Sequence, residues 1–206
     1  MRRIWLSAAI AVQIAMVASG AAAAAETFTE FKKFCLDTDA GRESALAQAD
    51  ADHWIPVDPS KVQLPLQDGF QIDKVDLRAK RGEAGQVKML MIGKGQGTPF
   101  PGVSTPTAMV MCGLFERPAA PEQDTLAQWA GVPPIQTGAQ TLYAFTLGQG
   151  GHERIPMTAE ASAQEQLKIL KPLLDSGRIR VVGAGDLPGG GAALMFMALT
   201  GATDRP

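Results

Sequence analysis

Short segments with the two-residue periodicity of β-strands dominate this chain, and they follow one another in runs. In residues 70–79, for example, Val75, Leu77 and Ala79 alternate with charged side chains. Side chains of a strand point to opposite faces in turn, so this pattern indicates a strand with one buried face. Such segments predict about six strands, at residues 70–79, 87–92, 107–115, 140–147, 178–182 and 192–199.

Strands that arrive in runs, with helices grouped around them, are typical of an α+β fold with a mostly antiparallel sheet. The helical patterns are two near the N-terminus, a turn after Asp124 and a helix over residues 162–175. Their apolar stripes are narrow, and such helices bury the stripe against a larger element. Stretches rich in Gly and Pro, or polar throughout, predict loops at residues 55–69, 93–106, 148–157 and 183–191.

Residues 1–25 have the parts of a secretory signal peptide. Arg2 and Arg3 are followed by an apolar stretch and then by five alanines that end at Ala25. This order predicts export and cleavage before Glu26. The two arginines also suggest a twin-arginine signal, but the residues that usually flank such a pair are missing, so the general (Sec) route fits better.

The rest of the chain, residues 26–206, suffices for one exported domain and leaves little room for two. The whole sequence carries 19 Lys and Arg against 21 Asp and Glu, a net charge of −2. That balance argues against a nucleic-acid partner, because binding nucleic acid needs clustered cations. No later apolar run approaches the roughly 18 residues that cross a membrane, so we expect no transmembrane segment after signal cleavage.

Two cysteines, Cys35 and Cys112, are the only ones in the chain. Export would place them in an oxidising compartment, where cysteines pair. Neither belongs to a Cys-x-x-Cys motif and neither has a histidine nearby in sequence. A structural disulfide is therefore predicted, and a reactive or metal-binding thiol is the alternative.

Three of the predicted strands contain a Met-x-Met pattern: Met89 and Met91, Met109 and Met111, and Met195 and Met197. Each pair lies on one face of its strand. If Cys35 bonds to Cys112, the first helix covers the Cys112 face, and Met111 must point to the other. We interpret the methionines as filling an irregular core. Two alternatives stay open: a thioether site for Cu(I), and an adaptable apolar groove for a peptide or lipid-like ligand.

Two histidines, His53 and His152, are the candidate catalytic bases. His152 precedes Glu153 in a polar segment, and this pair gives the alternative of a hydrolase-like enzyme. His53 ends a helical pattern, where a protonated imidazole interacts favourably with the helix C-terminus. The Gly-x-Ser-x-Gly motif of a nucleophile elbow is absent from the sequence. Structural roles are therefore preferred for both histidines.

Two motifs resemble ligand-binding loops but lack features that such loops require. Asp37-x-Asp39-x-Gly41 lacks the later ligands of a calcium loop, so both aspartates are expected to cap a helix. The Gly-rich residues 93–98 run into Pro99 and not into the helix that a phosphate-binding loop needs. We therefore expect no cofactor and no metal.

The motif Phe31-x-x-Phe34-Cys35-Leu36-Asp37-Thr38, followed by Ala49-x-Ala51-Asp52-x-Trp54-x-Pro56, resembles a pattern in small exported bacterial proteins of unknown function. The resemblance covers residues 31–56 and the later Cys112. It implies an exported α+β domain with a disulfide, and it implies no activity.

Together these features favour a soluble periplasmic or secreted domain without catalytic function. Its expected partner is an envelope protein, a peptide or a small ligand. The hydrolase and the carrier of a soft metal or lipophilic ligand are the alternatives.

Overall fold

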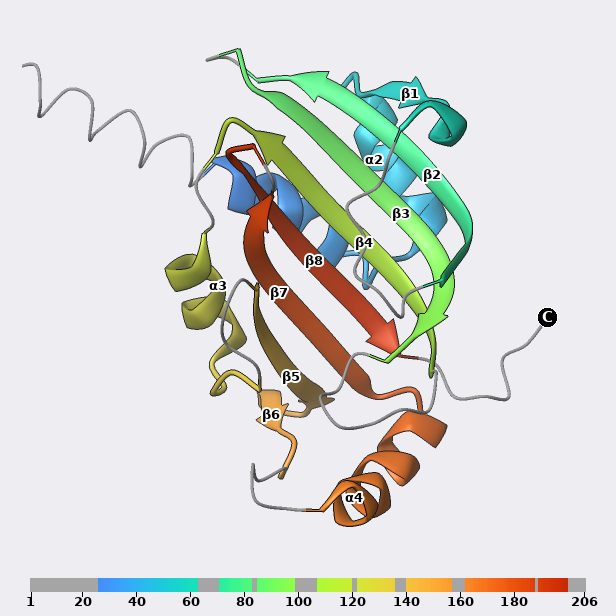
Figure 1. The fold of residues 1–206 in the computed structure, drawn as a ribbon, viewed down its shortest axis with the longest axis vertical. Coiled ribbons are helices and arrows are strands. Elements are labelled where there is room, and N and C mark those ends of the chain that lie inside the picture. The colour runs from blue at the N-terminus through green and yellow to red at the C-terminus, as the bar shows by residue number, and fades with distance from the viewer. Residues whose placement is uncertain are drawn as a thin grey trace, which may run out of the picture.

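A single antiparallel sheet forms the centre of the molecule (Figure 1). The structure, a computed structural model, describes residues 26–62, 71–82, 85–98, 107–119, 122–135, 140–156, 162–187 and 189–199. The described strands are β1 (Ile55–Val57), β2 (Gln71–Arg81), β3 (Val87–Gly97), β4 (Thr107–Arg117), β5 (Gln140–Gly148), β6 (Gly151–Arg154), β7 (Ile179–Leu187) and β8 (Gly191–Leu199). The predicted α+β class with an antiparallel sheet is confirmed.

The strand order is β1-β2-β3-β4-β8-β7-β5-β6, and every neighbouring pair is antiparallel. The C-terminal strand β8 therefore lies in the middle of the sheet, between β4 and β7. This arrangement joins the strands formed before residue 118 to those formed after residue 139. The central position of β8 agrees with its burial, because almost all of its residues are buried.

The expectation of six strands is wrong, because the described residues form eight. The two strands that the sequence did not predict, β1 and β6, are the edges of the sheet. β1 has three residues and contains Pro56, which an edge strand tolerates because it has an unpaired side. β6 has four residues, mostly exposed and polar, so it lacks an apolar alternation. Short edge strands of this kind leave little periodic signal.

Two predicted loops are also wrong, because glycine-rich residues continue the strands. Residues 93–97 belong to β3, and the segment assigned to a loop at 183–191 is mostly β7 and the start of β8. Gly183 pairs with Met195, and Gly93 pairs with Met111. At these two positions, side chains of neighbouring strands lie close to where a Cβ atom would be.

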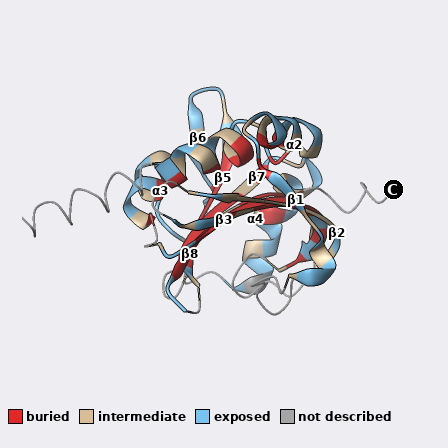
Figure 2. Cartoon of the chain, turned by 90° about the horizontal axis from the view of Figure 1, so that it is seen from above, coloured by how far each residue is buried: buried red, intermediate tan, exposed pale blue. Residues whose placement is uncertain are grey.

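Helices from the N-terminal part of the chain and α3 cover one face of the sheet (Figures 1 and 2). Residues 26–31 are α-helical and continue into a π-helical turn, Lys32–Leu36; we call residues 26–36 the N-terminal helix. Helices α2 (Arg42–Ala51) and α3 (Gln123–Ala130) lie on the same face. None of the described helices is long and apolar enough to cross a membrane.

The predicted disulfide between Cys35 and Cys112 is confirmed, with a Cα–Cα distance of 5.3 Å. It ties the N-terminal helix to β4 in the middle of the sheet. Cys112 packs with Phe34 and Trp54, whereas Met111 packs on the opposite face, as the alternation predicts. The ring of Phe34 meets Trp54 edge-on at 5.4 Å between centroids.

The other face of the sheet is covered by α4 (Ala163–Asp175), which packs Leu170 against Ile179 and Val181 of β7. Ser162 and Glu165 form a capping box at its start. Along this face glycine and large side chains alternate across the strands. One row contains Leu77, Met91, Gly113, Met195, Gly183 and Leu142.

Gly95 of β3 is a position where any side chain should disturb the sheet. A Cβ atom there would overlap the backbone carbonyl oxygen of Gln71, beside the irregular pairing between Ile72 and Lys74. We expect Gly95→Ala to lower the free energy of unfolding by about 1–3 kcal/mol, measured by urea denaturation. The matched control is Gly150→Ala, whose Cβ meets nothing within 4 Å. Equal midpoints for the two variants would contradict this prediction.

Candidate functional site

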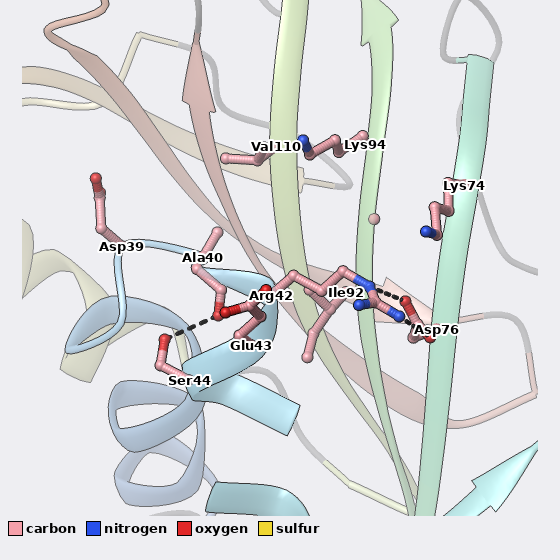
Figure 3. Close-up of a pocket in the computed structure, with 12 residues that line it drawn as sticks. Asp39, Ala40, Arg42, Glu43, Ser44, Lys74, Asp76, Ile92, Lys94 and Val110 are labelled. Carbon is pink, nitrogen blue, oxygen red and sulfur yellow. Dashed lines mark hydrogen bonds and ion pairs between the residues drawn. The ribbon is translucent and has the colours of Figure 1, made fainter. Parts of the chain in front are cut away.

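A pocket of about 650 Å³ opens on the helix-covered face, where the chain enters α2 (Figure 3). Its wall combines residues 39–44 with side chains from β2, β3 and β4. Three of these side chains are cationic (Arg42, Lys74 and Lys94) and three are anionic (Asp39, Glu43 and Asp76). The site is therefore polar along its rim, with Ile92 and Val110 at its base.

A tight turn between the N-terminal helix and α2 shapes one wall. Asp39 and Ala40 have positive φ angles of 50° and 55°, in the left-handed region that few side chains adopt. Backbone hydrogen bonds hold this turn, from Ala40 to Cys35 at 2.9 Å and from Gly41 to Thr38 at 2.8 Å. The disulfide lies directly before the turn, so it anchors this wall to the sheet.

The predicted helix capping by Asp37 and Asp39 is wrong, because Gly41 is the N-cap residue of α2 and no side chain caps the helix. Asp37 instead pairs with Lys32. Asp39 accepts two hydrogen bonds from the guanidinium of Arg180 in β7, both at 2.6 Å. The first turn of α2 thus lines the pocket without a side-chain cap, and its backbone N–H groups carry the positive end of the helix dipole.

Arg42 and Asp76 form a bidentate ion pair across the pocket. The guanidinium donates to the carboxylate at 2.6 and 2.8 Å, and Figure 3 shows it reaching from α2 to β2. The hydrogen bonds from Arg42 hold the pKa of Asp76 below its usual range. This pair fixes α2 relative to the sheet edge and leaves the other cations of the pocket for a ligand.

Lys74 and Lys94 lie directly opposite each other on β2 and β3. Both are exposed, and among the described residues neither forms an ion pair. Like charges in directly opposite positions destabilise a sheet. An anion bound between them would remove this repulsion.

The two lysines share one row of paired residues with a third cation, Arg180, on β7. Pairing places Lys74 opposite Lys94, Lys94 opposite Val110, Val110 opposite Ala198, and Ala198 opposite Arg180. Neighbouring strands lie about 4.8 Å apart, so the row extends over roughly 19 Å. Arg180 is neutralised by Asp39, whereas the lysine pair at the other end of the row forms no ion pair within the described residues.

His152 makes contacts that are typical of a structural residue. Its Nδ1 lies 3.0 Å from the carbonyl oxygen of Ala130, so this nitrogen carries the proton and donates. The imidazole stacks on Phe145 at 4.0 Å between centroids and meets Trp129 edge-on at 4.4 Å. These contacts join β6 to the C-terminal end of α3.

The structure does not place the side chains of the other candidate catalytic residues beside His152. Glu153 is the next residue of strand β6, so its side chain points to the opposite face. His53 is exposed and follows α2, with a positive φ angle of 63°. Within the described part of the chain, no group of three or more His, Cys, Asp and Glu residues could hold a metal ion.

Four of the six methionines proposed as ligand-binding residues are buried. The buried set is Met91, Met109, Met111 and Met197; Met89 and Met195 are partly buried. They pack with residues of α4 and the neighbouring strands. This environment agrees with methionine as a core-filling side chain.

Sequence reasoning missed the lysine pair because it assigned Lys94 to a loop. A signal was present: Lys88, Leu90, Ile92 and Lys94 continue a two-residue alternation through the glycines. The pairing register that places Lys94 opposite Lys74 is a tertiary property, and a single sequence does not contain it directly. Comparison with known proteins adds no assignment, since no protein-family model, curated protein or solved structure matches this chain.

Proposed function

We propose that this chain is an exported binding protein that takes an anionic group, a carboxylate or a phosphate, in the pocket beside α2. The observation that carries the proposal is the directly opposed pair of exposed lysines, Lys74 and Lys94, at the pocket rim. A sheet retains such a pair at a cost in stability, and a bound anion offsets that cost. The uncapped first turn of α2 adds donors for the same anion.

Export is supported by the signal-like residues 1–25, and the disulfide is compatible with an oxidising compartment. A non-catalytic role is favoured by the environment of the histidines. His152 is held by Ala130 and two aromatic rings, and His53 is exposed at a helix end. The partner is then a small acidic molecule or an acidic side chain of an envelope protein or peptide.

Replacing both lysines by alanine (K74A/K94A) should weaken anion binding by about tenfold or more, since two charge-assisted contacts are lost. The probes are inorganic phosphate, citrate and a short glutamate peptide, each measured by titration calorimetry at low and physiological salt. The control K168A/K171A removes the same charge from exposed positions on α4.

The folding stability of K74A/K94A separates binding from structure. Removing opposed like charges should leave the urea midpoint unchanged or slightly raised. Equal affinity of the wild type and K74A/K94A for every probe would contradict the proposal, as would an equal loss in K168A/K171A.

A further inference from the structure

Charged residues are buried around the first turn of the N-terminal helix, away from the lysine pocket. Glu116 at the end of β4 is 4% exposed, Glu122 before α3 is 6% exposed, and Lys88 of β3 is 1% exposed. Glu26 and Glu30 of the N-terminal helix complete the group, which we call the acid cluster. It contains four carboxyl groups and one ammonium group.

The ammonium group is already occupied. Lys88 Nζ donates to Glu26 at 3.0 Å and to Glu30 at 2.8 Å. Glu116 accepts a hydrogen bond from the hydroxyl of Thr27. No ion pair is formed by Glu122 within the described residues, although the charge of Lys88 acts on it and lowers its pKa.

One of the two carboxylate oxygens of Glu122 has a hydrogen-bond partner, and Glu122 contacts the first described turn of the helix. Its Oε1 accepts a hydrogen bond from the backbone N–H of Phe28 at 3.1 Å, whereas its buried Oε2 has no hydrogen-bond partner. Burial raises the pKa of Glu122 to about 7, against the opposing effect of the Phe28 N–H, and the charge of Glu116 adds to the rise. A buried carboxylate oxygen without a donor is costly, so a hydrogen-bond donor or a cation placed at this atom would stabilise the carboxylate.

The backbone nitrogen of Glu26 belongs to the same helical turn as the nitrogen of Phe28 that donates to Glu122. It precedes the nitrogen of Phe28 by two residues of the same helix, about 3 Å along the helix axis. N–H groups of a first helical turn all point toward the helix N-terminus. The nitrogen of Glu26 is also the atom that the predicted signal cleavage would release, because the small-residue motif ends at Ala25.

We propose that the α-ammonium group of Glu26, created by signal cleavage, binds the buried carboxylate of Glu122 and completes the acid cluster. Hydrolysis of the Ala25–Glu26 peptide bond consumes one water and leaves a carboxylate on Ala25 and an ammonium group on Glu26. An ordinary α-amino group has a pKa of about 7.7–8.0 and is therefore largely charged at neutral pH. Removal of the signal thus adds an ion pair to the fold, and the processed chain is more stable than its precursor. This inference rests on the export part of the proposed function and is independent of the lysine pocket.

The experiment begins with the intact mass of the protein exported from its own signal, which identifies the first residue. A chain beginning at Glu26 is then compared in three forms: with a free amine, with an acetylated amine, and with Ala25 retained. Each form is made as wild type, as Glu122→Gln and as the exposed control Glu153→Gln. Gln retains the oxygen that accepts from Phe28, so Glu122→Gln is expected to fold.

We expect acetylation or the extra residue to lower the folding equilibrium constant about tenfold or more in the wild type and in Glu153→Gln. In Glu122→Gln the same changes should have little effect. The pKa of the free α-amine, measured from the pH dependence of its acylation, should exceed about 8 in the wild type and return to its ordinary value in Glu122→Gln.

The pH dependence of the free energy of unfolding gives a second test, and the direction of the change can be predicted. In the blocked forms Glu122 has a raised pKa, so its contribution to stability is present below pH 4.5 and is lost as pH rises to about 7. The free ammonium should abolish that loss by holding Glu122 as a carboxylate beside it. The other charged groups facing Glu122, namely Glu116 and Lys88, are unchanged between the forms.

Three results would overturn the inference. An exported chain that begins at a residue other than Glu26 would remove the ammonium from the cluster. Equal stabilities of the free and acetylated wild type would show that no pair forms. An acetylation effect of the same size in Glu122→Gln would show that another group binds the amine. None of these results bears on phosphate or citrate binding at Lys74 and Lys94, so failure of one proposal is distinguishable from failure of the other.

Discussion

Removal of the disulfide by replacing both cysteines with alanine (C35A/C112A) is expected to lower the free energy of unfolding by about 2–5 kcal/mol. The bond closes a 77-residue separation, and in the chain-entropy model such a loop restricts the unfolded state by about 4–5 kcal/mol. Both cysteines are fully buried, so the truncation also leaves a cavity between the N-terminal helix and the sheet. Urea denaturation of the two proteins measures the difference.

A reducing agent supplies the matched control for this prediction. It should destabilise the wild type by a similar amount and leave C35A/C112A unchanged, since the variant has no bond to reduce. A variant within about 0.5 kcal/mol of the wild type would contradict the prediction. Anion binding should weaken with the same substitution, because the turn that forms one pocket wall follows Cys35 directly.

The alternation of apolar and polar residues was sufficient to predict the central strands, and the two cysteines of a chain expected to be exported were sufficient to predict the disulfide. The alternation even places Met111 and Cys112 on opposite faces, as the structure has them. The edges of the sheet could not be predicted in this way. β1 and β6 are short and largely exposed, and each pairs with one neighbouring strand.

The candidate site was predicted less well, for a physical reason. The sequence places Lys74 on the polar face of a strand, but which residue lies opposite depends on the register with β3. That register includes an irregularity at Ile72 and Lys74 and a glycine, Gly95, that allows close approach of Gln71. The repulsion between Lys74 and Lys94 is therefore a product of pairing, and neither lysine is unusual in its own segment.

The acid cluster was also beyond sequence analysis, because nothing in the pattern around Glu122 distinguishes a buried glutamate from an exposed one. Its burial results from the N-terminal helix lying across the ends of β3 and β4. Lys88 shows the same effect, since a lysine in an alternating strand is ordinarily solvent-exposed. Here it lies under the helix and is almost completely covered.

Replacing Lys88 by methionine should cost about 3–5 kcal/mol of stability, because it removes a buried ammonium and leaves the largely buried carboxylate of Glu30 without its cation. Burial lowers the pKa of Lys88, but the hydrogen bonds to Glu30 and Glu26 outweigh that effect, and the pKa is raised overall. The lysine is therefore charged throughout the neutral range, and methionine of similar length removes the charge with little change in volume. Urea denaturation at pH 7 measures the loss.

Lys80→Met is the matched control, since Lys80 also approaches Glu30, at 3.8 Å, but its side chain is 37% exposed. Exposed pairs contribute about 0–1 kcal/mol, so the control should lose far less. A second variant, Lys88→Met with Glu30→Gln, should recover part of the stability, because it removes one of the carboxylates left unpaired. If Lys88→Met were no less stable than Lys80→Met, burial of the ammonium would not be what makes this contact strong.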